Sequence, residues 1–576
     1  MLVCGIHDGH NAAAALVADG RLLGALQEER LTRCKNQNGF PERAIDQLLR
    51  AHGASWGEVD AFVFAGYESY GSPGLSHQDR AAQIRAYKEV GGRLGDLRRR
   101  LRHLTPLRRL VNKLRQAERA QHLKDRGVNA TKIFTVEHHR CHATTAYYGA
   151  GIDTDALVIT VDGAGDGLCA TVSVPGQDGR LNRLASVPEE DSLGILWALI
   201  TSMMGMVPLE HEYKLMGMAP YANGAGVADI TLKFGSAFEI SDGVWRRTAG
   251  VPEINYSYRY WRDRLEFSRF DFLCAGLQTF TEEIVPNWVR HWLRKTGRRK
   301  LRLSGGVFMN VKLNKILGEL PEVDDLYVFP SCGDETNAIG AAWVFLEDQG
   351  LTDQIVPVGA MYLGVAPSTT EYERAVEQAR ELGANVAEPP DPEAAVATLL
   401  ADGRIVAHFD GREEFGARAL GSRSILADPS RPEIVKPLNR AIKCRDFWMP
   451  FAASVMSEYE ETYINNPKRF AAPYMILAFD SKHTEEVRAA CHPEDRTVRP
   501  QVVYRNWNPR YYRILELFQQ KTGRGAVLNT SFNIHGEPIV SSPMDAVDVL
   551  KRSGLSYLAI GPYLVSKANT ENALQI

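Results

Sequence analysis

The sequence lacks the features of membrane-spanning, exported and disulfide-linked proteins. No uninterrupted apolar run in its 576 residues reaches the about 18 residues that cross a bilayer, so we expect no membrane contact. The first residues, MLVCGIHDGHN, carry no basic region followed by a cleavable apolar stretch, which predicts a cytoplasmic protein. The eight cysteines form no CxxC pair, so neither a disulfide framework nor a structural zinc finger is expected.

The composition predicts a globular protein with several domains. Apolar residues make up 44% of the chain and charged residues 24%, and the length is sufficient for about two to four domains. A net charge of -3 argues against a general nucleic-acid binder. One basic stretch, residues 95–126, has Leu and Val at helical spacing. We expect a solvated helix pair broken at Pro106, and keep an anionic or acceptor-facing role as the alternative.

Soft metal ligands are concentrated in TVEHHRCHATTAYY, residues 135–148. If this stretch is helical, His138 and His142 lie on one face about one turn apart, so both imidazoles can reach one metal ion. His139 then points elsewhere. Histidines at this spacing are also common on exposed helices, so the motif predicts a metal site only if acidic ligands join it.

A strand-turn-strand-hairpin pattern occurs twice. Residues 1–33 contain three apolar strands, the last two joined by an Asp19-Gly20 turn, and residues 156–187 repeat the pattern with an Asp178-Gly179 turn. Two such units followed by helices resemble the duplicated ribonuclease-H-like halves of the actin, Hsp70 and sugar-kinase superfamily, which bind a nucleotide between them. We therefore expect an α/β fold with this duplication in residues 1–355.

In that superfamily the turn after each first strand faces the phosphates. The resemblance places His7, Asp8, His10 and Asp162 at the cleft, together with the glycine pair of LSGGVFMNVKLN, residues 303–314.

Asp162 and Asp334 then supply the acidic ligands that the histidine motif needs. Asp334 precedes a small-residue helix in PSCGDETNAIGAA. Two imidazoles and two carboxylates suit iron, zinc or manganese better than calcium, and we expect Fe(II) or a similar divalent metal.

Residues 356–576 form the second expected domain. A new strand pattern begins near LTDQIVPVGAMYLG, and basic side chains then gather with hydroxyl and amide groups, as a site for polyanionic phosphates requires. These residues are Arg412, Arg418, Arg423, Lys443, Arg445, Arg499, Asn529, Ser531 and Asn533.

Six stretches together resemble the NodU/CmcH family of O-carbamoyltransferases, which includes the tobramycin carbamoyltransferase. They are HNAAAALVADG, QEERLTRCK, EYKLMGMAPYA, LSGGVFMN, EFGARALGSRSILADP and LNTSFNIHGEPIV. The resemblance implies that a YrdC-like α+β C-terminal domain makes carbamoyl adenylate from carbamoyl phosphate and ATP, with Mg and with release of pyrophosphate. The N-terminal domain, similar to the tRNA threonylcarbamoyltransferase subunit, then transfers the carbamoyl group to a hydroxyl and releases AMP.

The resemblance also implies roles for individual residues. His10 would be the general base, and His138, His142, Asp162 and Asp334 the metal ligands. Contacts to carbamoyl adenylate would come from Lys35, Asp162, Gly305, Gly306 and Asn310. ATP and carbamoyl phosphate would be bound by Arg418, Arg423, Lys443, Arg445, Arg499, Asn529, Ser531 and Asn533.

Two departures from the family pattern bear on these roles. Asn11 follows His10 where the family usually has aspartate, so Asp8 is a candidate to orient the base and His7 a competitor for its role. The run Glu210-His211-Glu212-Tyr213 replaces a smaller, glycine-containing run, which points to a different acceptor.

The expected acceptor is a hydroxylated natural product. Residues 244–267 interleave Trp and Tyr with Arg, so they form either a platform for a sugar ring or an edge strand that packs on its own domain. Alternative functions are a threonylcarbamoyl-type transferase acting on tRNA and a non-catalytic nucleotide switch. A carbamoyltransferase of hydrogenase maturation would need paired-cysteine zinc fingers, which are missing. A homodimer is left open.

Overall fold

The computed structural model describes residues 1–68, 105–443 and 446–568, with the backbone alone for 105–110. The chain divides into two units, one of Met1–Glu28 with Asn36–Val358 and one of Glu29–Lys35 with Gly359–Ile576. This division falls after Val358, close to the boundary expected at residue 355, but it also assigns a short N-terminal segment to the second unit. Among the described residues, no helix has the length and apolarity to cross a membrane.

The first unit begins with a five-stranded sheet of order β3-β2-β1-β4-β5. Its strands are β1 (Leu2–His7), β2 (Ala13–Ala18), β3 (Arg21–Gln27), β4 (Ala61–Ala65) and β5 (Ile133–Val136). β1, β2 and β3 are antiparallel neighbours, whereas β4 and β5 run parallel to β1. Asp19 and Gly20 both have positive φ and form the predicted hairpin turn. The third of the strands expected within residues 1–33 ends at Gln27, where helix α1 (Glu28–Thr32) begins.

A second sheet of the same unit has the order β12-β11-β6-β7-β8. Its strands are β6 (Ala156–Gly165), β7 (Leu168–Pro175), β8 (Leu181–Pro188), β11 (Lys300–Ser304) and β12 (Asp325–Val328). β6 is antiparallel to β7 and parallel to β11, and β11 is parallel to β12. The two sheets therefore have the same strand order and strand directions, and the expected mixed α/β class is confirmed.

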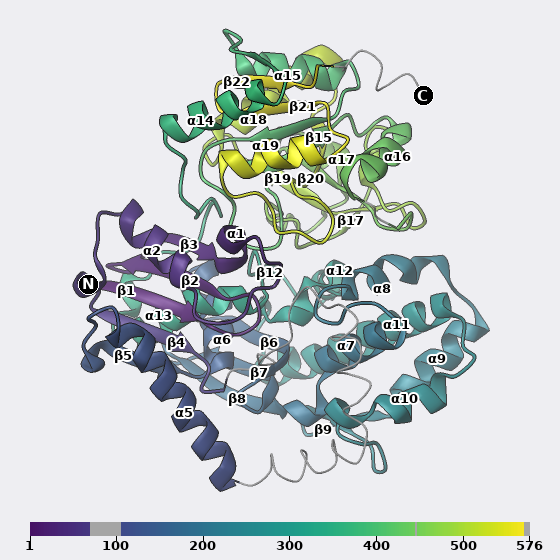
Figure 1. Cartoon of the computed structure of the whole chain (residues 1–576). Helices are drawn as coiled ribbons and strands as arrows, with labels where there is room; N and C mark the ends of the chain where they lie inside the picture. The colour runs from purple at the N-terminus through teal and green to yellow at the C-terminus, as the bar shows by residue number, and fades with distance from the viewer. Residues whose placement is uncertain (69–104, 444–445, 569–576) are drawn as a thin grey trace. The chain divides into compact units, whose positions relative to one another are not determined.

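Two helices lie between these sheets (Figure 1). Helix α6 (His138–Ala150) packs on β6 and β11 of the second sheet, helix α13 (Asn337–Asp348) packs on β1, β2 and β4 of the first, and the helices pack on each other. A Cβ at Gly5 would overlap Ala338 of α13, and one at Gly340 would overlap Cys141 of α6. These glycines let the backbones approach closely, which brings the N-terminal ends of both helices to the ends of β1 and β6.

The remaining elements of the first unit pack on the sheets or on one another. They are α2 (Glu42–Ala51), α5 (Thr105–Lys124), α7 (Leu193–Met203), α8 (Glu212–Met218), α9 (Ala225–Gly235), α10 (Tyr258–Leu265), α11 (Phe270–Thr296), α12 (Val311–Glu319), and the hairpin β9 (Phe238–Ser241) and β10 (Val244–Arg247). Residues 95–104 of the basic stretch lie outside the described residues. Pro106 lies in the first turn of α5, where proline is tolerated.

The aromatic stretch 244–267 is a core element in part, which corrects the platform interpretation for its tryptophans. Trp245 and Trp261 are fully buried, and Trp245 contacts Trp288 of α11 edge to face at 4.5 Å between ring centroids. Tyr258 and Tyr260 begin helix α10 rather than an edge strand.

The second unit is built on an eight-stranded sheet of order β13-β22-β21-β14-β15-β20-β16-β19. These strands are β13 (Asn385–Ala387), β14 (Val406–Phe409), β15 (Arg423–Ala427), β16 (Ala452–Met456), β19 (Pro500–Val503), β20 (Ala526–Ser531), β21 (Tyr557–Ile560) and β22 (Tyr563–Ser566). The other elements are α14 (Thr369–Glu381), α15 (Pro392–Ala401), α16 (Val435–Leu438), α17 (Glu460–Tyr463), α18 (Pro509–Thr522), α19 (Pro543–Arg552), β17 (Phe479–Asp480) and β18 (Thr497–Val498).

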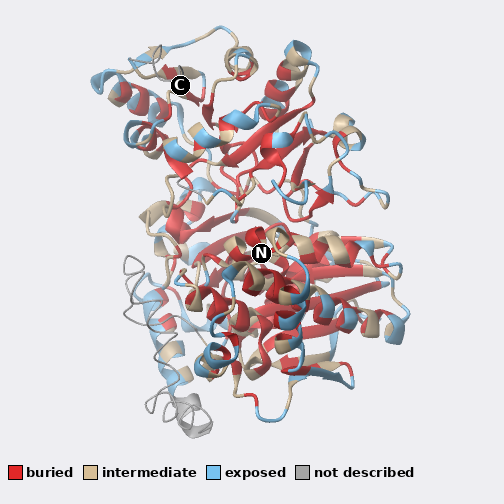
Figure 2. Cartoon of the chain, turned by 90° about the vertical axis from the view of Figure 1, so that its right-hand side faces the viewer, coloured by how far each residue is buried: buried red, intermediate tan, exposed pale blue. Residues whose placement is uncertain are grey.

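Both faces of this sheet are covered. In β14, Ala407 and Phe409 belong to the core shared with α14 and α19, whereas Val406 belongs to the core shared with α15 and α18. Figure 2 shows the strands of both units as buried and the outer faces of many helices as exposed. Because helices cover both faces, β14, β15 and β16 are buried along their whole length.

Candidate functional site

Four predicted metal ligands meet in the first unit. His138 and His142 project from the first turns of α6, Asp162 comes from β6, and Asp334 opens the short turn before α13. One potential ligand atom from each lies within 4.8 Å of the others. His138 Nε2 is 3.4 Å from Asp162 Oδ2 and 3.4 Å from Asp334 Oδ1, and His142 Nε2 is 3.3 Å from Asp334 Oδ1. The acidic residues that the histidine motif needed are therefore present.

Local hydrogen bonds fix the start of α6. The Glu137 side chain accepts hydrogen bonds from the backbone N–H groups of His139 and Arg140, and Asp166 accepts one from His138 N at 2.8 Å. A Cβ at Gly165 would overlap the His138 ring, so only glycine leaves room for that imidazole. The helix cap and the glycine turn after β6 together set where His138 points.

A second layer of polar groups holds the far side of these ligands. His142 Nδ1 lies 3.3 Å from Ser304 Oγ, and Asp162 Oδ1 accepts a hydrogen bond from Gly306 N at 2.8 Å. His142 Nε2 and Asp162 Oδ2 are thereby turned toward the cluster, as second-layer contacts do in metal sites. The buried Oδ1 of Asn337, whose Nδ2 lies 3.1 Å from His142 Nε2, finds no hydrogen-bond partner among the described residues. The two-imidazole, two-carboxylate donor set fits a borderline divalent metal.

The electrostatics of the cluster are dominated by its two carboxylates. Burial alone would lower the pKa of His138, but Asp334 and Asp162 raise it to about 10. Burial would raise the pKa of Asp162, yet His138 and His142 hold it below its ordinary value. His139 faces away, toward Thr160 Oγ1 at 2.9 Å, and burial with the charge on His138 lowers its pKa to about 3. The site therefore favours a bound cation.

The turn after β1 carries His10. His10 is half-buried, and Asn11 after it has a φ of 59°. His7 Nε2 lies 3.1 Å from the carbonyl oxygen of His10 and 3.9 Å from Asp334 Oδ2, and burial lowers the pKa of His7 to about 4. Asp8 forms an ion pair with Arg119. His7, the competitor for the base role, thus lies against the cluster, and Asp8, the candidate to orient the base, is paired with an arginine.

Gly305, Gly306 and Asn310 follow β11. Gly305 has a φ of 108°, and a Cβ there would overlap the backbone of Val161 in β6, so glycine is required for this approach. Asn310 caps α12 by accepting from Leu313 N. Gly306, a predicted adenylate contact, therefore lies next to the four predicted metal ligands. Asn310, another predicted contact, also serves as the N-cap of α12.

In the second unit, Lys443, Ser531 and Asn533 lie together. The buried Lys443 Nζ donates hydrogen bonds to Ser531 Oγ at 3.0 Å and Asn533 Oδ1 at 2.8 Å. Asn529 is buried in β20, two residues before Ser531. Its Nδ2 donates to Ser454 Oγ and to Gln501 Oε1. Arg445 lies outside the described residues.

The predicted arginines differ in their surroundings. Arg418 and Arg499 are half-buried. Arg423 is fully buried over the Phe409 ring, and its Nη atoms donate to the carbonyl oxygens of Asp410, Gly411 and Ser422. A direct contact of Arg423 with a phosphate would have to replace these bonds.

Sequence reasoning missed two buried carboxylates in REEFGARALGSR. Glu414 Oε1 accepts hydrogen bonds from the backbone N–H groups of Leu420, Ser422 and Arg423, at 2.7, 2.8 and 3.1 Å. Glu413 accepts a hydrogen bond from Ser541 Oγ. The signal was a pair of adjacent acids in an otherwise apolar stretch. The loop that carries Arg418 is thus wrapped around the Glu414 carboxylate.

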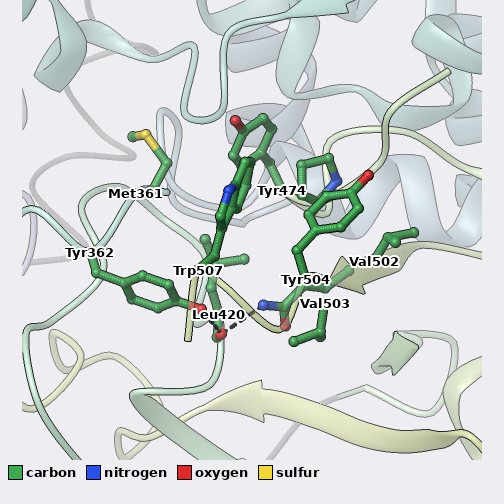
Figure 3. Close-up of a pocket in the computed structure, with 10 residues that line it drawn as sticks. Met361, Tyr362, Leu420, Tyr474, Val502, Val503, Tyr504 and Trp507 are labelled. Atoms are coloured by element: carbon green, nitrogen blue, oxygen red, sulfur yellow. Dashed lines mark hydrogen bonds between the residues drawn. The ribbon is translucent and has the colours of Figure 1, made fainter. Parts of the chain in front are cut away.

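An aromatic hollow, also unforeseen, lies beside the same loop (Figure 3). Tyr474 and Trp507 stack at 5.8 Å. The hydroxyl of Tyr362 and the side-chain amide of Gln501 both donate to the Leu420 carbonyl oxygen, at 2.8 and 2.6 Å. Because Gln501 also accepts from Asn529, this network connects Asn529 to the Arg418 loop.

Lys35 belongs to the second unit, within Glu29–Lys35. Its Nζ donates to both carboxylate oxygens of Glu29, at 3.1 and 3.2 Å.

Comparison with known proteins identifies the family. The family model described as the carbamoyltransferase N-terminus matches residues 2–343, and that of the carbamoyltransferase C-terminus matches residues 397–567. The chain is 32% identical to the nodulation protein NolNO of Sinorhizobium fredii, over 97% of this chain and 79% of that protein. It is 29% identical to the 3'-hydroxymethylcephem-O-carbamoyltransferase of Amycolatopsis lactamdurans, over 97% of this chain and 98% of that protein.

Among solved structures, the phosphate- and nucleotide-bound form of HypF aligns with a TM-score of 0.34 at 12% identity, covering 59% of this chain and 45% of that one. This likeness is too weak to carry an argument. The two family models and the relatives that match along nearly the whole length show that the chain is a member of the carbamoyltransferase family, enzymes that transfer carbamoyl groups.

Proposed function

We propose that this enzyme is an ATP-dependent O-carbamoyltransferase that works in two half-reactions. Carbamoyl phosphate, ATP and one water give carbamoyl adenylate, pyrophosphate and phosphate; a hydroxyl then attacks the carbamoyl carbon, the bond to AMP breaks, and AMP leaves. The observation that carries the proposal is the family match over residues 2–343 and 397–567. A relative over almost the full length is named for O-carbamoyl transfer to a hydroxymethyl group.

The second unit is proposed to make the adenylate. Its donor site would use the ammonium of Lys443 with Ser531 and Asn533, and the cationic side chains of Arg418 and Arg499, to neutralise the phosphates as they meet. Arg445 and Asn529 complete the proposed set. Arg423 would hold the backbone of Asp410 and Gly411 in place rather than contact a phosphate, because its Nη atoms donate to their carbonyl oxygens. ATP enters with Mg²⁺ as co-substrate.

The first unit is proposed to carry out the transfer. His10, in the turn after β1, would take the proton of the acceptor hydroxyl, a contribution typically of about 10²- to 10⁴-fold. His138, His142, Asp162 and Asp334 would hold a divalent metal, with Fe(II) as the expected ion. When bound, such an ion supplies Lewis acidity and a fixed position for a phosphate oxygen. Gly306 N, which donates to Asp162 Oδ1, would hold that carboxylate in place beside the ion.

The fold proposed for the first unit is the duplicated ribonuclease-H-like arrangement. Support comes from the identical strand order and directions of the two sheets, and from the turn after β1 and the equivalent strand β6, which carry His10 and Asp162. A YrdC-like fold is proposed for the second unit.

The acceptor is proposed to be a hydroxyl group of a small natural product. The test is incubation with carbamoyl phosphate, ATP, Mg²⁺ and a panel of hydroxylated metabolites, followed by mass spectrometry. A gain of one carbamoyl group on a panel member, dependent on ATP and accompanied by AMP and pyrophosphate, supports the proposal. Carbamoyl transfer that proceeds equally without ATP contradicts it.

A further inference from the structure

A short segment near the N-terminus belongs structurally to the C-terminal unit. The chain leaves the first unit after Glu28 and returns to it at Asn36, and Glu29–Lys35 is assigned to the second unit. This segment contains two arginines, Arg30 and Arg33, each of which contacts a loop that carries proposed donor-site residues.

Arg30 contacts the first of these loops. Its side chain is 2% exposed, its Nη2 donates to the Gly416 carbonyl oxygen at 2.6 Å, and its Nη1 lies 3.6 Å from Glu413 Oε2. Glu413 and Gly416 open the loop that leads to Arg418. The other end of that loop is tied to Glu414 through three backbone N–H groups. Arg30 therefore contacts the beginning of the Arg418 loop, whereas Glu414 holds its end.

Arg33 contacts the second loop. Its Nη1 donates to the Ile539 carbonyl oxygen at 2.6 Å and its Nη2 to the Pro538 carbonyl oxygen at 2.8 Å, while Nε lies 3.7 Å from Asp545 Oδ1. The start of the same loop carries Asn533, whose Nδ2 donates to the Glu537 carbonyl oxygen at 2.7 Å. Arg33 thus fixes the exit of the loop whose entrance contacts Lys443.

Simple packing does not account for the buried Arg30, and Arg33 is itself only partly exposed. Burying a charge is expensive, and replacing a buried ion pair by apolar side chains of similar volume is often neutral or stabilising. What the guanidinium adds is direction, because its planar donors reach two acceptors in a fixed geometry. Arg33 directs its two Nη atoms to the carbonyl oxygens of Ile539 and Pro538, and Arg30 directs one to the Gly416 carbonyl oxygen and the other toward the Glu413 carboxylate.

From these contacts we propose that Arg30 and Arg33 are positioning residues for adenylate formation, although they lie in the N-terminal part of the sequence. The proposal rests on the proposed function of the second unit. Arg30 sets the Arg418 loop and Arg33 sets the Asn533 loop, so that the cationic and polar groups of both reach the phosphates together. Lys35, the expected contact to carbamoyl adenylate, lies in the same segment Glu29–Lys35 as the two arginines.

The test uses full-length Arg30→Met and Arg33→Ala, with Arg21→Ala as the matched control on an exposed arginine of β3. We expect the carbamoyl-phosphate-dependent exchange between ATP and pyrophosphate to fall about tenfold or more in both variants, since small misplacements of reacting groups have effects of that size. The control should exchange at the parent rate. Added methylguanidinium should restore part of the exchange in Arg33→Ala, which a loss of fold would not allow.

The outcomes separate this inference from the proposed function. If the parent protein shows no exchange, the proposed function of the second unit fails. If the parent exchanges and both variants do so at the same rate, the inference is overturned. It is also overturned if the lost exchange matches the fraction of protein that circular dichroism shows to be unfolded. Arg33→Lys, which keeps the charge without the paired donors, should remain folded and still exchange slowly.

Discussion

The guanidinium of Arg119 in α5 binds both carboxylate oxygens of Asp8, at 2.7 and 2.6 Å, and donates a third hydrogen bond to the Gly66 carbonyl oxygen. Arg119 is 4% exposed. The basic stretch 95–126 was expected to be a solvated surface, but one of its arginines is buried beneath the turn that carries His10. Both carboxylate oxygens of Asp8 are thereby bound by Arg119.

Breaking this pair is expected to affect both stability and transfer. Arg119→Ala leaves the half-buried Asp8 carboxylate without its partner, which should destabilise the protein by about 1 to 3 kcal/mol. Because the His7–Asn11 turn loses its support, transfer from supplied carbamoyl adenylate should fall about tenfold or more, while exchange between ATP and pyrophosphate persists. Lys113→Ala, on an exposed face of the same helix, is the control. Unchanged transfer in a destabilised Arg119→Ala protein would show that the pair has only a structural role.

The metal prediction has a control in the next residue. His138→Ala and His142→Ala should each remove the bound metal, measured by elemental analysis of the purified protein, and should abolish transfer. His139→Gln should keep the metal, because His139 faces Thr160 rather than the cluster. Equal metal content in all three variants would contradict the four-ligand assignment.

The donor-site prediction concerns Lys443. Lys443→Ala removes a buried ammonium that contacts Ser531 and Asn533, so carbamoyl-phosphate-dependent exchange between ATP and pyrophosphate should be lost, as it should in Arg418→Ala. Lys436→Ala removes an exposed lysine of α16 and should leave the exchange rate unchanged. Parent exchange rates in Lys443→Ala would place adenylate formation elsewhere.

A pH effect is expected from Glu212, in the run that departs from the family pattern. Burial raises the pKa of Glu212 to about 7 from 4.5. The folded state binds this proton more tightly than the unfolded chain, so the stabilisation is complete below pH 4.5 and is lost as the pH rises through about 7.

Glu212→Gln should therefore raise the Tm at pH 8 and flatten its dependence on pH between 4.5 and 7. Glu239→Gln, an exposed carboxyl of β9, should change neither. If Tm follows pH identically in Glu212→Gln and in the parent, the carboxyl has an ordinary pKa.

What the sequence predicted well was local. The His138 and His142 spacing, the Asp19-Gly20 turn and the strand before Asp162 are short-range patterns with a direct geometric meaning. The four predicted ligands lie together. They stand at the start of a helix, near the end of a strand or in the short turn before a helix, positions that sequence patterns locate well. Ser531, which ends β20, and Asn533, two residues later, likewise lie together around Lys443.

What the sequence did not predict depends on contacts between distant residues. That Glu29–Lys35 packs with residues beyond 358 follows from Arg30 meeting Gly416 and Arg33 meeting Ile539, and no local pattern encodes such pairs. The burial of Trp245 is similar, since its partner Trp288 lies on another helix. In the sequence Glu414 cannot be told from a surface carboxylate, because the three backbone N–H groups that bind it come from residues six to nine positions later.

Adenylate formation and carbamoyl transfer are proposed as separate reactions that use separate residues, and the His10→Asn variant distinguishes them. The variant removes the proposed base while leaving the second unit unchanged. Exchange between ATP and pyrophosphate should continue at the parent rate, while carbamoyl transfer to the acceptor falls by about 10²-fold or more and the adenylate accumulates or hydrolyses. Loss of both activities together in a folded His10→Asn protein would show that the two reactions are not separated in this way, and normal transfer by it would show that His10 is not the base.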